Sequence, residues 1–214
     1  MKKIIIASIF GCTLLSVYAQ QPTSAPQTLP AEEFKIWKIP NVTNGAESYF
    51  SPDGKTLIYN GKEGTDTTHY VYTINIDGTN RKKINDKGSD ACSYFNPNGK
   101  ALIWTSTRDN LDLPAGDWSD TKNYPTGAEL YTSDLNGGNV KRLTFNKQYD
   151  AEVTYATDGH KILFGRQIDG KMDLWTMNPD GSNQKQITFT DDWQEGGAVY
   201  LSDNKTIVTR AWKK

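Results

Sequence analysis

The chain has 214 residues, with 24 Lys and Arg against 25 Asp and Glu, for a formal net charge of −1. The basic residues are spread along the whole chain, which argues against a nucleic-acid-binding surface, because such a surface gathers Lys and Arg in one stripe. The sequence shows neither heptads nor amphipathic helical patterns, so we expect an all-β protein.

The N-terminus has the three regions of a secretory signal peptide. Two lysines at positions 2 and 3 precede an apolar run over residues 4–17, and a small-residue site ends at Ala19, after which we expect cleavage. The apolar run is too short to span a membrane. The alternative is a lipid-anchored outer-membrane form through Cys12, which the bulky Phe10 disfavours. We therefore predict a signal peptide over residues 1–19 and a periplasmic or secreted protein.

Two short segments separate the signal from the repeats. Residues 20–33 are rich in Gln, Pro, Ser and Thr, which predicts a flexible tether. Residues 34–40 alternate apolar and polar side chains, like the last strand of a repeat that has no repeat in front of it. We expect this strand to close a ring of sheets by completing the last sheet and so removing an open edge.

From residue 48 onward the chain repeats one unit of four short β-runs. One anchor, typified by Ser-Pro-Asp-Gly-Lys, places its third residue at positions 53, 98, 158 and 203, in steps of 45, 60 and 45. A second anchor, typified by Pro-Asp-Gly-Ser-Asn, occurs at residues 76–80, 135–139 and 179–183 and precedes a short basic strand. Asp-Gly and Asn-Gly pairs tolerate the positive φ of tight hairpins, so each unit predicts an antiparallel meander. Repeats of this length predict a β-propeller.

We expect three complete four-stranded blades and part of a fourth. Their limits are residues 48–85, 93–144, 151–188 and, for the partial blade, 198–214. Because propellers have roughly four to eight blades, the pattern indicates a piece of a larger propeller; the alternative is that two chains associate to complete each other's ring. Large aromatic residues recur at equivalent strand positions, where we expect packing between blades. These are Tyr59, Trp104, Phe164, Tyr131 and Trp175.

The second blade is lengthened by a loop over residues 106–128, rich in Asp, Pro and Trp. Long loops inside compact repeats are usually functional or disordered, and disordered segments seldom carry large aromatic residues. Trp118 and Tyr124 therefore predict an ordered loop. Exposed aromatic residues in loops are often part of a recognition surface, although pinning the loop is an equal alternative.

Meander geometry brings the entries into the first strands and the loops after the second strands to one face. The entries into the first strands carry acids, namely Glu47, Asp90, Asp150, Glu152 and Glu195. The ends of the second strands carry arginines, namely Arg108, Arg166 and Arg210. The residues that we predict to bind a ligand or partner at the channel mouth are Arg108, Asp109, Asp112, Asp117, Trp118, Asp120, Tyr124, Glu152, Arg166, Trp193, Gln194 and Glu195.

Carboxylates gathered at a channel mouth could bind a cation through oxygen ligands. The alternative is that each acid pairs with a neighbouring Arg or caps a strand end. The aspartates of the loop lack the spacing of an EF-hand, and His69 and His160 are expected on opposite faces without a partner. Hydrolase and phosphate-binding motifs are missing. We predict no catalytic residue, metal site or cofactor, and expect Cys92 to be a small core residue.

The repeats resemble those of the TolB-like propeller family. The motifs that carry the resemblance are Ser-Pro-Asp-Gly-Lys at 51–55, Asp-Leu-Trp-Thr-Met at 173–177 and Asp-Gly-Ser-Asn at 180–183 with Ile-Thr at 187–188. The resemblance covers residues 48–210 and implies a periplasmic or surface location and protein binding within an envelope assembly. The chain departs from TolB in showing no N-terminal α/β domain and fewer repeats. Similar repeats occur in peptidase-associated propellers and some polysaccharide lyases.

These observations predict a non-enzymatic binding module, a protein–protein interaction scaffold of the cell envelope that uses one propeller face. The competing hypothesis is a carbohydrate-active or hydrolase-associated propeller with a ligand or cation site at the channel mouth.

Overall fold

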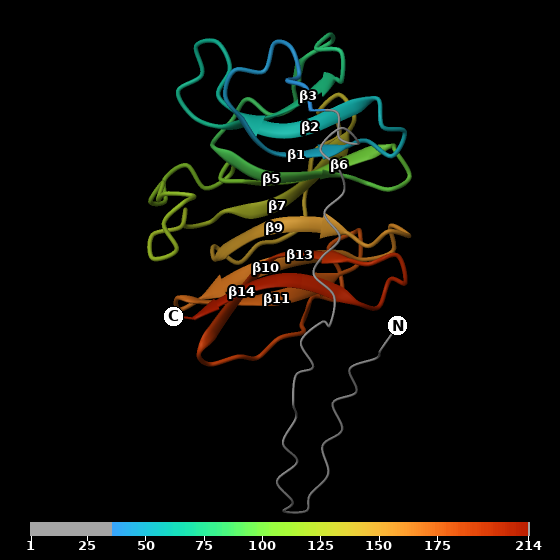
Figure 1. Cartoon of the computed structure of the whole chain (residues 1–214). Coiled ribbons are helices and arrows are strands. Elements are labelled where there is room, and N and C mark those ends of the chain that lie inside the picture. The colour runs from blue at the N-terminus through green and yellow to red at the C-terminus, as the bar shows by residue number, and fades with distance from the viewer. Residues whose placement is uncertain (1–35, 214) are drawn as a thin grey trace, which may run out of the picture. The chain divides into compact units, whose positions relative to one another are not determined.

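The computed structural model describes residues 36–213, and within them it contains fourteen strands and no helix. All fourteen strands belong to one compact unit, Ile39–Lys214. The strands form three four-stranded antiparallel meanders and one two-stranded sheet, stacked face to face (Figure 1). The predicted architecture of three complete blades and a partial fourth is therefore confirmed.

Blade one consists of β1 (Gly45–Phe50), β2 (Thr56–Gly61), β3 (Tyr70–Asn75) and β4 (Lys82–Lys83). Blade two consists of β5 (Asp90–Phe95), β6 (Ala101–Ser106), β7 (Glu129–Asp134) and β8 (Lys141–Arg142). Blade three consists of β9 (Tyr149–Tyr155), β10 (Ile162–Ile168), β11 (Lys171–Met177) and β12 (Lys185–Gln186). The partial blade consists of β13 (Trp193–Tyr200) and β14 (Ile207–Lys213).

Turn chemistry joins the first two strands of every blade. Asp53 Oδ1 accepts hydrogen bonds from the Lys55 backbone N–H at 3.1 Å and from the Ser51 hydroxyl at 2.6 Å. Gly54 follows at a φ of +70°, a conformation that favours glycine. The short polar side chain of the anchor accepts a backbone N–H within the turn and so stabilises it. The repeated anchors therefore form hairpin turns, as predicted.

The first strand of each blade contains a β-bulge and begins earlier than predicted. In blade two the register passes from Ala91 opposite Thr105 to Ser93 opposite Trp104, which leaves Cys92 as the extra residue. Corresponding shifts occur in β1, β9 and β13. A bulge reverses the alternation of side chains, so the period-2 pattern stops at the bulge although the strand continues for two to four residues before it.

The core lies between neighbouring blades. Ile58, Val71 and Ile84 of blade one pack against Phe95 and Trp104 of blade two in one buried cluster. A second cluster joins blades two and three, and a third joins blade three to the partial blade. Each fully buried Leu or Ile contributes about 1.5–3 kcal/mol. The predicted aromatic packing between blades holds for Trp104, Tyr131 and Phe164, each at most 1% exposed, while Trp175 is half-buried. Tyr59 is equally buried, but it packs within blade one, in a cluster that contains no residue of blade two.

The strand predicted over residues 34–40 is not formed in residues 36–40, the part of it that the structure describes. Ile36 is 94% exposed, so the alternating pattern does not bury its apolar side. A β-strand needs a neighbouring strand to take up its backbone hydrogen bonds, and alternation of side chains alone cannot supply that neighbour. Of residues 36–213, none lies in a helix long and apolar enough to cross a membrane.

Candidate functional site

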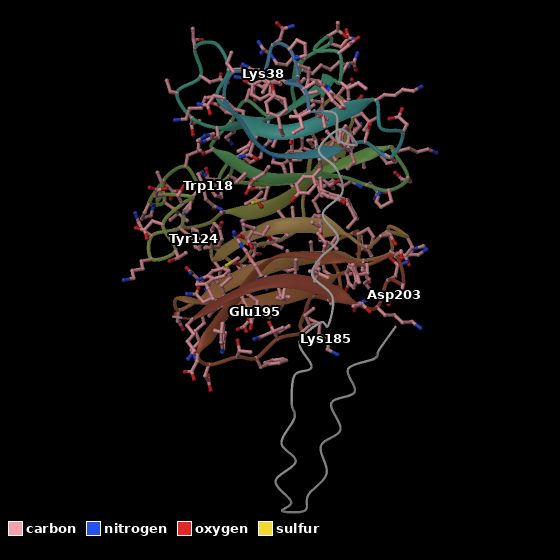
Figure 2. The ribbon with its side chains drawn as sticks, in the orientation of Figure 1. Lys38, Trp118, Tyr124, Lys185, Glu195 and Asp203 are labelled. Atoms are coloured by element: carbon pink, nitrogen blue, oxygen red, sulfur yellow. The ribbon has the colours of Figure 1, made fainter. Side chains whose placement is uncertain are left out.

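The first strands β1, β5, β9 and β13 lie side by side and form the wall of a channel. At one end of this channel is a cavity of about 530 Å³ that continues into a second hollow of about 260 Å³. The long loop lies at this end, since its Trp118 and Tyr124 line the larger cavity. Figure 2 shows both residues at the end of the blades opposite to Asp203, which marks a hairpin turn.

Aromatic side chains of the long loop form one wall of the cavity. Tyr124 stacks on Tyr149 of β9 with ring centroids 4.0 Å apart and an interplanar angle of 6°, and Trp118 lies 6.0 Å from the same ring. The Trp118 Nε1–H donates to Ser89 Oγ at 2.9 Å. Burial raises the pKa of the Tyr149 hydroxyl well above its usual value. The loop is thus folded back onto the channel, as its aromatic content predicted.

The bulge residues of the four first strands line the smaller hollow together. They are Glu47, Cys92, Glu152 and Gly197, with φ between +44° and +59°. The Cys92 N–H donates to Glu47 Oε2 at 2.9 Å, and the Gly197 N–H donates to Glu152 Oε2. A carboxylate in one blade therefore takes up the bulge N–H of another blade, which fixes both acids against the wall.

Glu152 and Arg210 form an ion pair inside the cavity. The Glu152 carboxyl is largely buried, and this burial raises its pKa, although the Arg210 guanidinium counteracts the effect. The same guanidinium lies 5.3 Å from the ring centroid of Trp212. The predicted site residue Glu152 is therefore in the cavity together with Trp118 and Tyr124.

The structure places Arg166 and Glu195 in the blades themselves. Arg166 forms a buried bidentate pair with Asp150, with Nε to Oδ1 at 2.6 Å and Nη2 to Oδ2 at 2.7 Å. Glu195 is 5% exposed and accepts hydrogen bonds from the hydroxyls of Thr188 and Thr190. Neither residue lines the cavity. The contacts of both residues agree with the alternative stated above, in which these side chains form ion pairs or cap strand ends within the fold.

The charged residues of the long loop lie near the mouth but outside the cavity lining. Asp117 and Asp120 accept hydrogen bonds from the backbone N–H groups of Ser119 and Lys122, and Asp112 is exposed. Asp109 accepts from the Tyr131 hydroxyl at 3.1 Å.

The remaining three predicted residues are also outside the cavity. Arg108 has its guanidinium 5.7 Å from the Tyr131 ring centroid. Trp193 is 41% exposed beside Lys213, and Gln194 is buried in β13.

Several cavity residues were missing from the predicted site. The sequence pattern predicts Glu47 at a strand entry, Arg210 at a strand end and Cys92 in the core, so none of the three is among the predicted binding residues. Tyr149 and Trp212, which also line the cavity, are not among them either. One signal in the sequence could have found two of the missing residues: Glu47, Cys92 and the predicted residue Glu152 are separated by the same 45- and 60-residue steps that separate the hairpin anchors. Across residues 36–213 no three His, Cys, Asp or Glu side chains gather as a metal site requires.

Asp90, another cavity residue, makes stability depend on pH. Its buried carboxyl accepts the Val71 N–H at 3.0 Å and the Asn85 amide at 2.7 Å, and burial raises its pKa to about 7. The folded state then binds this proton more tightly than the unfolded state, so stability is fully present below the unfolded value near 4 and falls as pH rises through 7. The loss is at most about 4 kcal/mol.

Urea unfolding of the wild type and of Asp90→Asn at about pH 4.5 and about pH 8 measures this effect. We expect the difference in unfolding free energy between the two proteins to shift in favour of Asp90→Asn at the higher pH. A difference that stays constant with pH would show that Asp90 does not titrate in this range.

The comparisons with known proteins support the fold. No family model matches the sequence. A curated relative, the uncharacterized protein Atu1656 of Agrobacterium fabrum (strain C58), is 31% identical over 67 residues, which are 30% of this chain and 23% of the relative. Among solved structures, TolB from Acinetobacter baumannii matches with 24% identity and a TM-score of 0.52, over 68% of this chain and 32% of that chain. The putative TolB from Agrobacterium tumefaciens matches with 20% identity and a TM-score of 0.53, over 67% and 50%.

This chain therefore spans about a quarter of the curated relative and between a third and a half of these two TolB structures. Identity at this level shows the fold alone. The blades have the fold of the TolB propeller, as the repeated motifs predicted.

Proposed function

We propose that this chain is a non-enzymatic binding module of the cell envelope, which holds a protein partner at the channel end. The proposal rests on one observation: Trp118 and Tyr124, the two large aromatic residues of the long loop, line an open cavity of about 530 Å³. Half-buried aromatic residues around a hollow are the anchors that protein interfaces use most. The TolB-like fold of the blades supports the same role.

The proposed location is the periplasm or the cell exterior. The signal peptide and the cleavage after Ala19 remain predictions, because residues 1–35 lie outside the described part of the chain. The same holds for lipidation of Cys12. Cys92 is the one cysteine between residues 36 and 213, and it is buried in the channel wall as a free thiol, which is compatible with export to an oxidising compartment.

In-cell photo-crosslinking tests the proposal. A photoreactive amino acid replaces Thr121, which lines the cavity, and in a second protein it replaces Leu201, an exposed residue at the opposite hairpin end. We expect a protein adduct from position 121 that is absent from position 201. Adducts common to both positions would contradict a partner site at the channel end. An acidic oligosaccharide or divalent cation that stabilises the protein, in place of any adduct, would favour the carbohydrate-active or cation-binding alternative.

Trp118→Ala should weaken the adduct formed from position 121 roughly tenfold or more, because a tryptophan anchor is commonly worth about 2 kcal/mol or more at an interface. Its side chain is half-buried in a loop, so the melting temperature should change little. Leu201→Ala is the matched control and should leave the adduct unchanged. Loss of the adduct together with a large fall in melting temperature would assign Trp118 to holding the loop in place.

A further inference from the structure

The charges around the channel are unbalanced toward the negative. The larger cavity and the smaller hollow share the side chains of Glu47, Cys92, Glu152 and Arg210. Among the described residues, Arg210 is the one Lys or Arg side chain that lines either hollow. It pairs with Glu152, so Glu47 is left as a carboxylate without a cation.

Glu47 is nevertheless held firmly. Its Oε2 accepts the Cys92 N–H at 2.9 Å, and its Oε1 lies 3.6 Å from the Cys92 thiol. With the Asn60 amide turned to donate, the amide nitrogen lies 3.0 Å from the same Oε2. None of the ion pairs formed within residues 36–213 includes Glu47, and the residue is exposed. The carboxylate is therefore fixed in direction by neutral donors and keeps its charge open to the channel.

The backbone of Glu47 is also unusual, because its φ of +50° lies in the left-handed region that non-glycine residues seldom occupy. The equivalent position in the partial blade is Gly197, the residue type that fits this conformation without strain. Strained backbone of this kind gathers at functional sites, where a particular side chain is needed in a particular place. The glutamate at this bulge therefore adopts a backbone conformation that its residue type disfavours, as Cys92 and Glu152 do at the equivalent bulges.

The cavity wall next to these acids is aromatic. Trp118, Tyr124, Tyr149 and Trp212 all line it. Aromatic faces attract cations through the ring quadrupole and also cover apolar stems, and the attraction grows when water is excluded. A side chain with a long apolar stem and a positive end satisfies the aromatic wall and the unpaired carboxylate at once, which an anionic or neutral side chain cannot do.

We propose that Glu47 and this aromatic wall form a receptor for a lysine or arginine side chain that projects from the protein partner into the channel. The inference rests on the proposed function, since it names the chemistry by which the same cavity recognises its partner. The cation would meet the carboxylate of Glu47 at the boundary of the two hollows, with its stem along the rings of Trp118 and Tyr124. Glu152 remains paired with Arg210, and it holds the cavity wall in place through its hydrogen bond from the Gly197 N–H.

Two N-acetylated tripeptide amides test the receptor, Gly-Lys-Gly and its uncharged counterpart with norleucine in place of lysine. Both are titrated into the intact mature chain, and binding is followed by tryptophan fluorescence and by NMR line broadening of the peptide. We expect saturable millimolar binding of the lysine peptide, at least tenfold weaker binding of the norleucine peptide, and loss of this preference in high salt, which screens charges.

Glu47→Gln is the decisive variant, because glutamine keeps the shape and can still accept the Cys92 N–H while it removes the charge. We expect it to weaken the lysine peptide about five- to thirtyfold, as a coupling of charged partners gives, and to leave the norleucine peptide unchanged. Asp203→Asn, at the opposite hairpin end, is the matched control and should change neither. Equal binding of both peptides, absence of saturable lysine-peptide binding, or an unchanged preference in Glu47→Gln overturns the receptor.

These outcomes separate the two proposals. A crosslinked partner without any lysine preference would retain the binding module and remove the cationic recognition. Lysine-peptide binding that depends on Glu47, without a crosslinked protein, would retain the receptor and remove the protein-binding function.

Discussion

Arg166→Ala should lower the free energy of unfolding by about 3–5 kcal/mol, since removing one partner strands the other as a buried charge. The Arg166 guanidinium is 8% exposed and meets the fully buried Asp150 carboxylate in two parallel hydrogen bonds. It also donates to Gln184 Oε1 at 2.9 Å and lies 4.5 Å from the ring centroid of Trp175. The substitution would therefore leave the Asp150 charge without its cation and the Trp175 ring without its cover.

Urea unfolding followed by circular dichroism measures the change. Lys171→Ala provides the matched control, because Lys171 also pairs with an aspartate, Asp191, but at the surface, where both side chains are about half exposed or more. The control should cost less than about 1 kcal/mol. If both variants lose the same small amount, the Arg166–Asp150 pair is sufficiently hydrated to contribute little, and the structural role assigned to Arg166 is wrong.

The result also bears on Arg166 as a predicted partner-binding residue. Its guanidinium already donates three hydrogen bonds to Asp150 and Gln184, so a loss of partner capture in Arg166→Ala would have to be compared with the loss of fold. Arg210 is the arginine that reaches the channel.

The two arginines both lie near the ends of second strands, but they are not at equivalent positions of the repeat: Arg166 comes eight residues after its hairpin anchor Asp158, and Arg210 comes seven residues after Asp203. Their partners differ through register. Arg166 stands directly opposite Asp150 in the ladder, whereas Arg210 stands opposite Gly196, which has no side chain to meet it. Arg210 therefore turns to Glu152 of blade three. This pairing joins residues from two blades and depends on how the sheets stack, which strand periodicity does not encode.

The parts of the fold that local chemistry determines were predicted well. Asp-Gly and Asn-Gly anchors impose positive φ and backbone-capping side chains, so they mark hairpins wherever they occur. The recurring aromatic residues also predicted packing between blades, because they occupy equivalent strand positions in successive repeats. The bulges were missed because a bulge removes the very alternation by which a strand is recognised. Glu47 and Cys92 lie at bulges of neighbouring blades, so the hydrogen bond between them could not be predicted from either blade alone.

The cavity was predicted in part. The aromatic residues of the long loop indicated that the loop is folded, and Trp118 and Tyr124 do line the cavity. Their neighbour Tyr149 was not predicted, since a tyrosine at the start of a strand is as easily explained by the core. Long-range stacking, such as that of Tyr124 on Tyr149, arises from the path of a loop that carries few regular constraints.

Trp104→Ala should lower the free energy of unfolding by about 3–5 kcal/mol, as expected when a fully buried tryptophan is truncated and its cavity cannot collapse. Trp104 is 0% exposed, lies in the cluster between blades one and two, and stacks on Tyr131 with ring centroids 6.2 Å apart. The substitution removes a large part of the contact that holds blade one against blade two. Denaturant unfolding at neutral pH gives the magnitude.

Trp104→Phe separates packing from polarity. Among the described residues, the Trp104 Nε1–H is one of the buried groups without a hydrogen-bond partner, so phenylalanine keeps an aromatic ring while it removes an unsatisfied donor. We expect this variant to lose less than about 2 kcal/mol. Equal losses in both variants would show that the indole nitrogen is satisfied by water, and a small loss in both would show that blades one and two are held together elsewhere. Because Glu47 belongs to blade one and Cys92 to blade two, loosening this interface in Trp104→Ala should also separate the carboxylate from its N–H donor, and the preference for the lysine peptide should fall with it.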